Sequence, residues 1–283
     1  MNLWPEDYQQ AWALAAPVER VGVGLHSGAR SRVRLQASDR AGIWLGSLGP
    51  AAGELTQLHP DQVRDTRLCT ALQAGEQRLA TVEHLLAALV GTGLTHVELL
   101  VEGEEVPLLD GSAQGWVEAI AEAGLTCLGE RPPLQVLDGP VTVQQGSAFI
   151  TALPAEKIRL AAAVEYPQAA IGRQLFSLDL SPATFVAELA PARTFGFREQ
   201  IEQLRAAGLI QGGALDNALV CDGDHWINPP LRFLDEPVRH KLLDLLGDLA
   251  LVGLPQAQVF AYRGSHGLHT SLAAVLAAQS RPS

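Results

Sequence analysis

Two stretches of this chain repeat one order of secondary-structure elements, and this repeat constrains the fold more than any other sequence feature. Each stretch begins with short strand-like runs and continues with a helix, a strand and a second helix. In the first stretch these elements are expected at 19–26, 32–36, 42–45, 81–90, 95–101 and 112–124. In the second they are expected at 140–145, 147–153, 158–166, 237–252, 256–262 and 267–279.

The repeat predicts an α+β protein made of two similar domains, each a sheet with two helices. The break 129-GERPP-133 separates them, since Gly and Pro interrupt regular structure. The predicted domains are therefore residues 1–129 and 134–283. The two halves share little sequence identity, so this inference rests on element order alone.

The helix at 81–90 has recognisable end signals. Thr81 is the expected N-cap, and Gly91 and Gly93 are expected to stop the helix. The later helix begins with Pro237 in its first turn, where a missing N–H costs nothing.

One segment of the second half, residues 191–220, does not fit the repeat. It reads as a strand, an amphipathic helix with Ile201, Leu204 and Leu209 on one side, a turn at Gly212-Gly213 and a second strand. We therefore predict a βαβ insertion. It holds more apolar residues than a surface insertion needs.

The charge balance excludes nucleic acid as a partner. The formal net charge is −11, from 20 basic and 31 acidic residues, whereas binding to a phosphate backbone requires a basic surface. One small anionic ligand held by a few local cations is not excluded.

The cysteines and the apolar runs indicate a cytoplasmic protein. Cys69, Cys127 and Cys221 are widely spaced and form no CxxC pair, which is typical of a reducing compartment. The first residues contain Glu6 and Asp7 but no basic run, so we expect no signal peptide. No uncharged apolar run reaches the about 18 residues of a membrane span.

The helix 237-PVRHKLLDLLGD-248 places three polar side chains on one stripe against leucines. His240, Asp244 and Asp248 are four residues apart, and residues at this spacing share a helix face. Such stripes are usually solvated surface. However, the neighbouring Lys241 is one of only two lysines beside 18 arginines, and an ammonium group is not interchangeable with a guanidinium.

A second pair of candidate residues, Glu83 and His84, begins the equivalent helix of the first half. Alone, Glu83 is explained by the positive end of the helix dipole. If the two helices pack together, however, His84, His240 and Asp244 meet at one point. Two imidazoles and a carboxylate form both a known catalytic zinc set and the iron(II) facial triad, so the ligands do not separate these metals.

Other motifs carry less weight. His59, His225 and His269 have no local partner pattern and are expected to be structural or on the surface, and His96 is expected to pack within a strand. The run 22-GVGLHSG-28 lacks the spacing and the following helix of a dinucleotide fingerprint, so a turn between strands is expected.

The chain resembles the UDP-3-O-acyl-N-acetylglucosamine deacetylases, metal-dependent amidohydrolases of lipid A biosynthesis. The similar stretches are collinear and span nearly the whole chain. They are 22-GVGLHSG-28, 65-DTRLCT-70, 81-TVEHLLAAL-89, 107-PLLDGSA-113, 192-ARTFGF-197, 208-GLIQGGALDNALV-220, 234-LDEPVRHKLLDLLGDL-249 and the Gly-Ser-His-Gly around His266.

The resemblance implies a fold and a set of roles. The helices would be sandwiched between the two sheets, and zinc, or alternatively iron(II), would be held by His84, His240 and Asp244. Glu83 would be the base and His266 a second acid–base group. Thr194 would donate to the oxyanion, Lys241 would line the site, and Asp248 would orient His266. The insertion would form an apolar passage for the acyl chain, lined by Phe195, Ile201, Leu204 and Leu209.

The implied reaction removes the N-acetyl group of a UDP-sugar glycolipid and releases acetate. We expect a monomer without a transmembrane segment. Peripheral contact with a membrane remains open. Two other classes remain open from the residues alone: an iron(II) oxygenase, which would need a cosubstrate site, and a non-catalytic metal-containing binding protein, which would not need Glu83.

Overall fold

The computed structural model describes residues 3–49, 53–131 and 133–279 and contains two large sheets. The seven-stranded sheet has the order β10-β1-β9-β3-β2, with β4 beside β9 and β5 beside β4. Its strands are β1 (Gln10–Leu14), β2 (Val18–Val23), β3 (Arg30–Ala37), β4 (Gly42–Ser47), β5 (Thr56–Gln57), β9 (His96–Glu102) and β10 (Leu125–Glu130).

The six-stranded sheet has the order β12-β13-β19-β14-β15, with β11 beside β19. Its strands are β11 (Gln135–Val136), β12 (Val141–Gln145), β13 (Ala148–Pro154), β14 (Arg159–Glu165), β15 (Arg173–Asp179) and β19 (Pro255–Tyr262). One sheet thus takes all its strands from residues 10–130 and the other from residues 135–262. The break predicted at 129–133 overlaps the end of β10, which includes Gly129 and Glu130.

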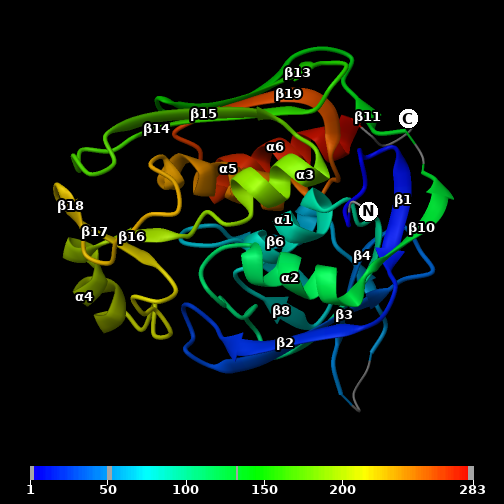
Figure 1. Ribbon diagram of the computed structural model, residues 1–283, viewed down its shortest axis with the longest axis horizontal. Helices are drawn as coiled ribbons and strands as arrows, with labels where there is room; N and C mark the ends of the chain where they lie inside the picture. Colours follow the sequence, from blue (N-terminus) through cyan, green and yellow to red (C-terminus); the bar gives the residue numbers. More distant parts are fainter. Residues whose placement is uncertain (1–2, 50–52, 132, 280–283) are drawn as a thin grey trace.

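The main helices form a layer between the two sheets (Figure 1), and the predicted sandwich is confirmed. They are α1 (Glu83–Gly91), α2 (Gln114–Ala123), α5 (Glu236–Leu249) and α6 (His266–Gln279). A short helix α3 (Pro182–Thr184), followed by a π-helical turn over Phe185–Leu189, lies in the same layer. Within the described ranges, no helix is long and apolar enough to cross a membrane.

Helix α1 is buried because it is apolar in nearly every direction. All nine residues of α1 are buried, including both of its polar ones. In α5 the leucines are buried as well, and His240, Asp244 and Asp248 are buried among them. The stripe on α5 is therefore not a solvated face.

Close contact between α1 and α5 depends on one glycine. A Cβ on Gly247 would lie 1.9 Å from the Glu83 carbonyl oxygen, a distance that no side chain can occupy. The absence of a side chain at Gly247 thus lets the backbones of the two helices approach each other directly.

The cap predicted for α1 is wrong. The N-cap residue is Val82, which makes no side-chain capping hydrogen bond. Thr81 instead has a positive φ of 56°, and its hydroxyl donates to the Glu105 carboxylate at 2.9 Å. A long-range contact has taken the place of the local cap.

The predicted βαβ insertion is present, and it lies at one edge of the molecule (Figure 1). Strand β16 (Phe195–Phe197) pairs in parallel with β17 (Leu219–Asp222), and α4 (Arg198–Ala206) connects them. An antiparallel strand β18 (His225–Trp226) extends this sheet beyond the predicted end at residue 220. A further small sheet contains β6 (Val63–Asp65), β7 (Ala71–Ala74) and β8 (Gln77–Leu79), after a 3₁₀ turn at Pro60–Gln62.

Candidate metal centre

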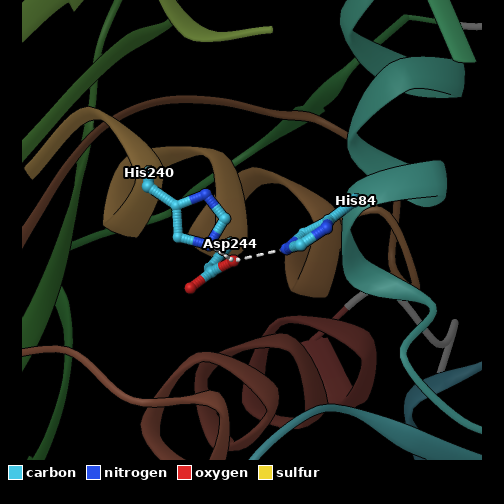
Figure 2. A group of neighbouring side chains, drawn as sticks. All are labelled: His84, His240 and Asp244. Atoms are coloured by element: carbon cyan, nitrogen blue, oxygen red, sulfur yellow. Dashed lines mark ion pairs between the residues drawn. The ribbon is translucent and has the colours of Figure 1, made fainter. Parts of the chain in front are cut away.

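Two neighbouring helices bring His84, His240 and Asp244 together (Figure 2). His84 lies in the first turn of α1, whereas His240 and Asp244 lie one turn apart on α5. The Asp244 Oδ1 atom is 3.5 Å from His84 Nε2 and 3.3 Å from His240 Nε2. The ring centroids of the two histidines are 4.9 Å apart.

These three residues fit a divalent metal ion. The Asp244 Oδ1 atom is buried and has no hydrogen-bond partner among the described residues, which is costly unless a cation or donor meets it. His240 Nδ1 donates to Ala192 O at 3.0 Å, so in the neutral ring Nε2 carries the lone pair. One ligand atom from each residue lies within 4.8 Å of the others, and the donor types are those of zinc and iron(II) sites.

The charge states also suit a metal site, because ligands must be deprotonated. Burial lowers the pKa of His240 to about 3. Burial opposes ionisation of Asp244, but His240 and Lys241 outweigh it and hold the pKa of this carboxyl well below its usual value. Lys241 Nζ donates to Asp244 Oδ2 at 2.8 Å.

Glu83 lies beside this cluster and is 3% exposed. Burial raises the pKa of its carboxyl above the usual value. Its Oε2 accepts a hydrogen bond from the Thr70 amide at 3.0 Å, and its Oε1 is 4.0 Å from His266 Nε2. The carboxylate is therefore held in place on one side and faces an imidazole on the other.

Asp248 holds His266 by its other ring nitrogen. His266 Nδ1 donates to Asp248 Oδ2 at 3.0 Å, and the Thr70 hydroxyl donates to Asp248 Oδ1. Burial lowers the pKa of His266, but Asp248 and Glu83 outweigh burial and raise it to about 9. His266 is thus a cation at neutral pH with Nε2 directed towards Glu83.

A second imidazole shares this carboxylate. His269 Nδ1 donates to Asp248 Oδ2 at 2.9 Å, and His269 is 1% exposed. A surface position for His269, one of the two alternatives expected from the sequence, is therefore wrong. A Cβ on Gly264 would lie 2.6 Å from His269 Nε2, so Gly264 leaves room for the ring.

The first residues of the insertion pass the cluster. The Phe195 ring centroid is 6.3 Å from that of His240, and Lys241 Nζ is 5.7 Å from the Phe195 centroid. Thr194 is fixed through its backbone, since its amide donates to Gly111 O at 2.7 Å. It lies two residues after Ala192, the partner of His240.

The other predicted substrate-binding residues lie farther along the insertion. Ile201 and Leu204 are half-buried on α4, a helix with no fully buried residue, and Leu209 is half-buried just after it. No contact between these three side chains and the metal cluster is recorded in the described chain. The loop that follows pairs with the turn after β2, since Gly212 N donates to Leu25 O at 3.0 Å.

Sequence reasoning missed two residues that contact the carboxylates of this site. Thr70 contacts both Glu83 and Asp248, and His269 shares Asp248 with His266. Thr70 is the last residue of 65-DTRLCT-70, so this motif carried a usable signal. Nothing local indicated His269, because its partner is 21 residues away.

Comparison with known proteins places this site in a family. The family model described as UDP-3-O-acyl N-acetylglycosamine deacetylase matches residues 11–278. A protein of Thermosynechococcus vestitus named UDP-3-O-acyl-N-acetylglucosamine deacetylase is 48% identical over 94% of this chain and 93% of its own length. One of the same name from Synechocystis is 46% identical over 93% and 97%.

A plant protein is also similar. The Arabidopsis thaliana protein named "Probable UDP-3-O-acyl-N-acetylglucosamine deacetylase 1, mitochondrial" is 41% identical over 92% of this chain and 86% of its own length. The family match covers most of the chain and includes every residue of the cluster described above. The chain therefore belongs to the UDP-3-O-acyl-N-acetylglucosamine deacetylase family.

Proposed function

We propose that this protein is a zinc-dependent amidohydrolase that removes the N-acetyl group from UDP-3-O-acyl-N-acetylglucosamine in lipid A biosynthesis. Water adds to the amide carbonyl, the C–N bond breaks, and acetate and a sugar amine result. The observation that carries the proposal is the unpartnered Asp244 Oδ1 between two imidazoles, with a buried carboxylate beside it. Family membership supports the same reaction.

His84, His240 and Asp244 would hold the ion. When bound, a divalent metal ion supplies Lewis acidity, which polarises a carbonyl and lowers the pKa of water to about 7.

Glu83 is proposed as the base. Burial raises the pKa of Glu83 towards neutral pH, and a carboxylate with a higher pKa is a stronger base. The Thr70 amide fixes Oε2 and leaves Oε1 free to accept the proton of water.

His266 is proposed as the acid. With its pKa raised to about 9, it holds a proton on Nε2 at neutral pH and can give that proton to the leaving amine. Asp248 orients the ring through Nδ1. The Thr194 hydroxyl would donate to the developing oxyanion, as preorganised donors do, and Lys241 would add positive charge at the rim of the site.

Phe195, Ile201, Leu204 and Leu209 are proposed to line the passage for the acyl chain. Their support is their half-buried state on a segment that begins beside His240. A reducing compartment, the cytoplasm in bacteria, is proposed because the cysteines are free. The Arabidopsis relative, in contrast, is named as mitochondrial. A monomeric state is proposed and can be measured by light scattering.

The direct test is release of acetate from UDP-3-O-acyl-N-acetylglucosamine by the metal-loaded protein. We expect activity that a chelator abolishes and that added zinc restores. If iron(II) restores more activity than zinc at equal occupancy, the proposed metal is iron(II) and not zinc. Absence of acetate release from fully loaded protein would refute the function.

A further inference from the structure

A cavity separate from the metal centre lies at the other end of the same two helices. Its volume is about 440 Å³, within the range of about 300–1,000 Å³ that small-molecule sites occupy. Its walls include Val90 near the end of α1 and Ala250 just after α5. Six residues of helix, about 9 Å, separate Val90 from His84 and Ala250 from Asp244, and no residue of the metal centre lines the cavity.

The walls are mostly apolar and come from the seven-stranded sheet, from α1 and α6, and from the segments that follow α1 and α5. Ile43 and Leu58 contribute from the first half, and Leu251 and Leu254 from the second. Although the chain carries a net charge of −11, no Asp or Glu lines this cavity. It therefore offers hydrocarbon surface without negative side chains.

The charged group on the wall is Arg131, and the described part of the chain offers it no counter-ion. None of the described carboxylates lies within ion-pair distance of its guanidinium, whose one recorded hydrogen bond is a long one of 3.5 Å to Tyr8 O. Burial lowers the pKa of Arg131, and no acidic neighbour offsets this. Buried charges in proteins are normally paired, so a half-buried, unpaired guanidinium beside a cavity indicates an anionic ligand.

Two histidines also line the cavity. Burial and the charge of Arg131 lower the pKa of His96. His59 also lines the cavity, and its Nδ1 is 3.0 Å from the exposed carboxylate of Asp61. An adjoining hollow of about 470 Å³ shares Arg131 and contains Asp138, but Asp138 does not line the cavity itself.

We propose that this cavity binds an amphipathic carboxylate, with its head group on the Arg131 guanidinium and its hydrocarbon chain against Leu251, Leu254 and Ile43. An Arg–carboxylate pair can be bidentate, and it would satisfy a charge that the protein leaves open. The apolar wall would remove the chain from water. This proposal does not depend on the reaction assigned to the metal centre.

The test is a calorimetric titration of the metal-loaded protein with decanoate. We expect one saturable equivalent. Methyl decanoate, which lacks the charge, and acetate, which lacks the chain, should each bind at least about tenfold more weakly, because each loses one of the two contributions.

Variants locate the binding site. Arg131→Gln should weaken decanoate binding about tenfold or more, and Arg131→Lys should recover most of the affinity because it keeps the charge. Asp138→Asn is the matched control and should not weaken binding, since Asp138 lines only the adjoining hollow. Leu204→Gln should also leave the affinity unchanged, which separates the cavity from the proposed acyl passage.

Three results would overturn the proposal. One is the absence of saturable binding by decanoate. Another is equal affinity of Arg131→Gln and the unmodified protein. The third is loss of binding in Leu204→Gln, which would move the ligand to the insertion.

Discussion

The two oxygens of Asp244 have different surroundings. One oxygen is available to a metal ion, and the other is held by a lysine. Oδ2 accepts from Lys241 at 2.8 Å, whereas Oδ1 is buried without a hydrogen-bond partner in the described structure. Removing any one of the three proposed ligands leaves an incomplete shell. His84→Ala, His240→Ala and Asp244→Ala should therefore each lose bound metal and activity, as measured by elemental analysis and acetate release. One full equivalent of metal in all three variants would contradict the assignment.

Glu83 should behave differently from its neighbour His84. Glu83→Gln keeps the size of the side chain but cannot accept a proton at neutral pH. It should retain the metal and lose about 10²- to 10⁴-fold in kcat, the usual contribution of a general base. His84→Ala is the comparison, because it should lose metal as well. Parallel loss of metal in Glu83→Gln would make Glu83 a ligand or a structural residue.

The pH dependence at the residue scale follows from Asp248. With its pKa raised to about 9, His266 is protonated below that pH and loses its proton as the pH rises through it. Activity that needs the cation should therefore fall on the alkaline side near pH 9. Asp248→Asn removes the opposite charge and should move this limb of the kcat/KM profile downward by about 1 pH unit or more. An unchanged alkaline limb in this variant would show that Asp248 does not set the pKa of His266.

At the scale of elements, the close contact of α1 and α5 sets the geometry of the proposed metal site. Gly247→Ala would place a methyl group 1.9 Å from Glu83 O, and the helices would have to separate. We expect a loss of about 1–3 kcal/mol in stability together with weaker metal binding, measured by thermal unfolding and chelator competition. Gly115→Ala is the control, because its Cβ would meet only the end of the Leu109 side chain, at 2.8 Å. Equal effects of both substitutions would remove Gly247 from the site.

Both helices were predicted from the sequence to within about three residues of their observed ends, because their apolar residues and glycines leave few alternatives. The polar stripe of α5 identified His240, Asp244 and Asp248 before any contact was known. Thr81 was wrongly predicted to cap α1, because its hydroxyl donates to the Glu105 carboxylate instead of accepting from the first turn of the helix. Thr70 stands in the motif 65-DTRLCT-70, but its contacts could not be read from that motif, and nothing local indicated His269, since each acts on a residue distant in sequence.

The apolar side chains on the helix of the insertion have few contacts that indicate their role. This helix, α4, has no fully buried residue, so Ile201 and Leu204 have apolar surface available to a ligand. If they line the acyl passage, kcat/KM should fall steeply as the 3-O-acyl chain shortens, with about 0.8 kcal/mol for each buried methylene. Ile201→Gln or Leu204→Gln should flatten that dependence without changing metal content. An unchanged dependence in folded variants would place the passage elsewhere.

At the scale of the whole molecule, the proposed metal ligands come from both halves of the chain. His84 lies on α1, between strands of the first sheet in sequence, and the other two lie on α5, among those of the second. An ion that binds this cluster therefore binds only where the two sheets have already closed over the helices.

Thermodynamic linkage turns this division of ligands into a property of folding. A ligand that binds only the native chain stabilises it by RT ln(1 + [L]/Kd), about 1.4 kcal/mol for each tenfold excess over Kd. The ion then acts as a cross-link between parts of the chain 156 residues apart, from His84 to His240. Scarcity of the ion in a cell would consequently lower the amount of folded enzyme as well as its turnover.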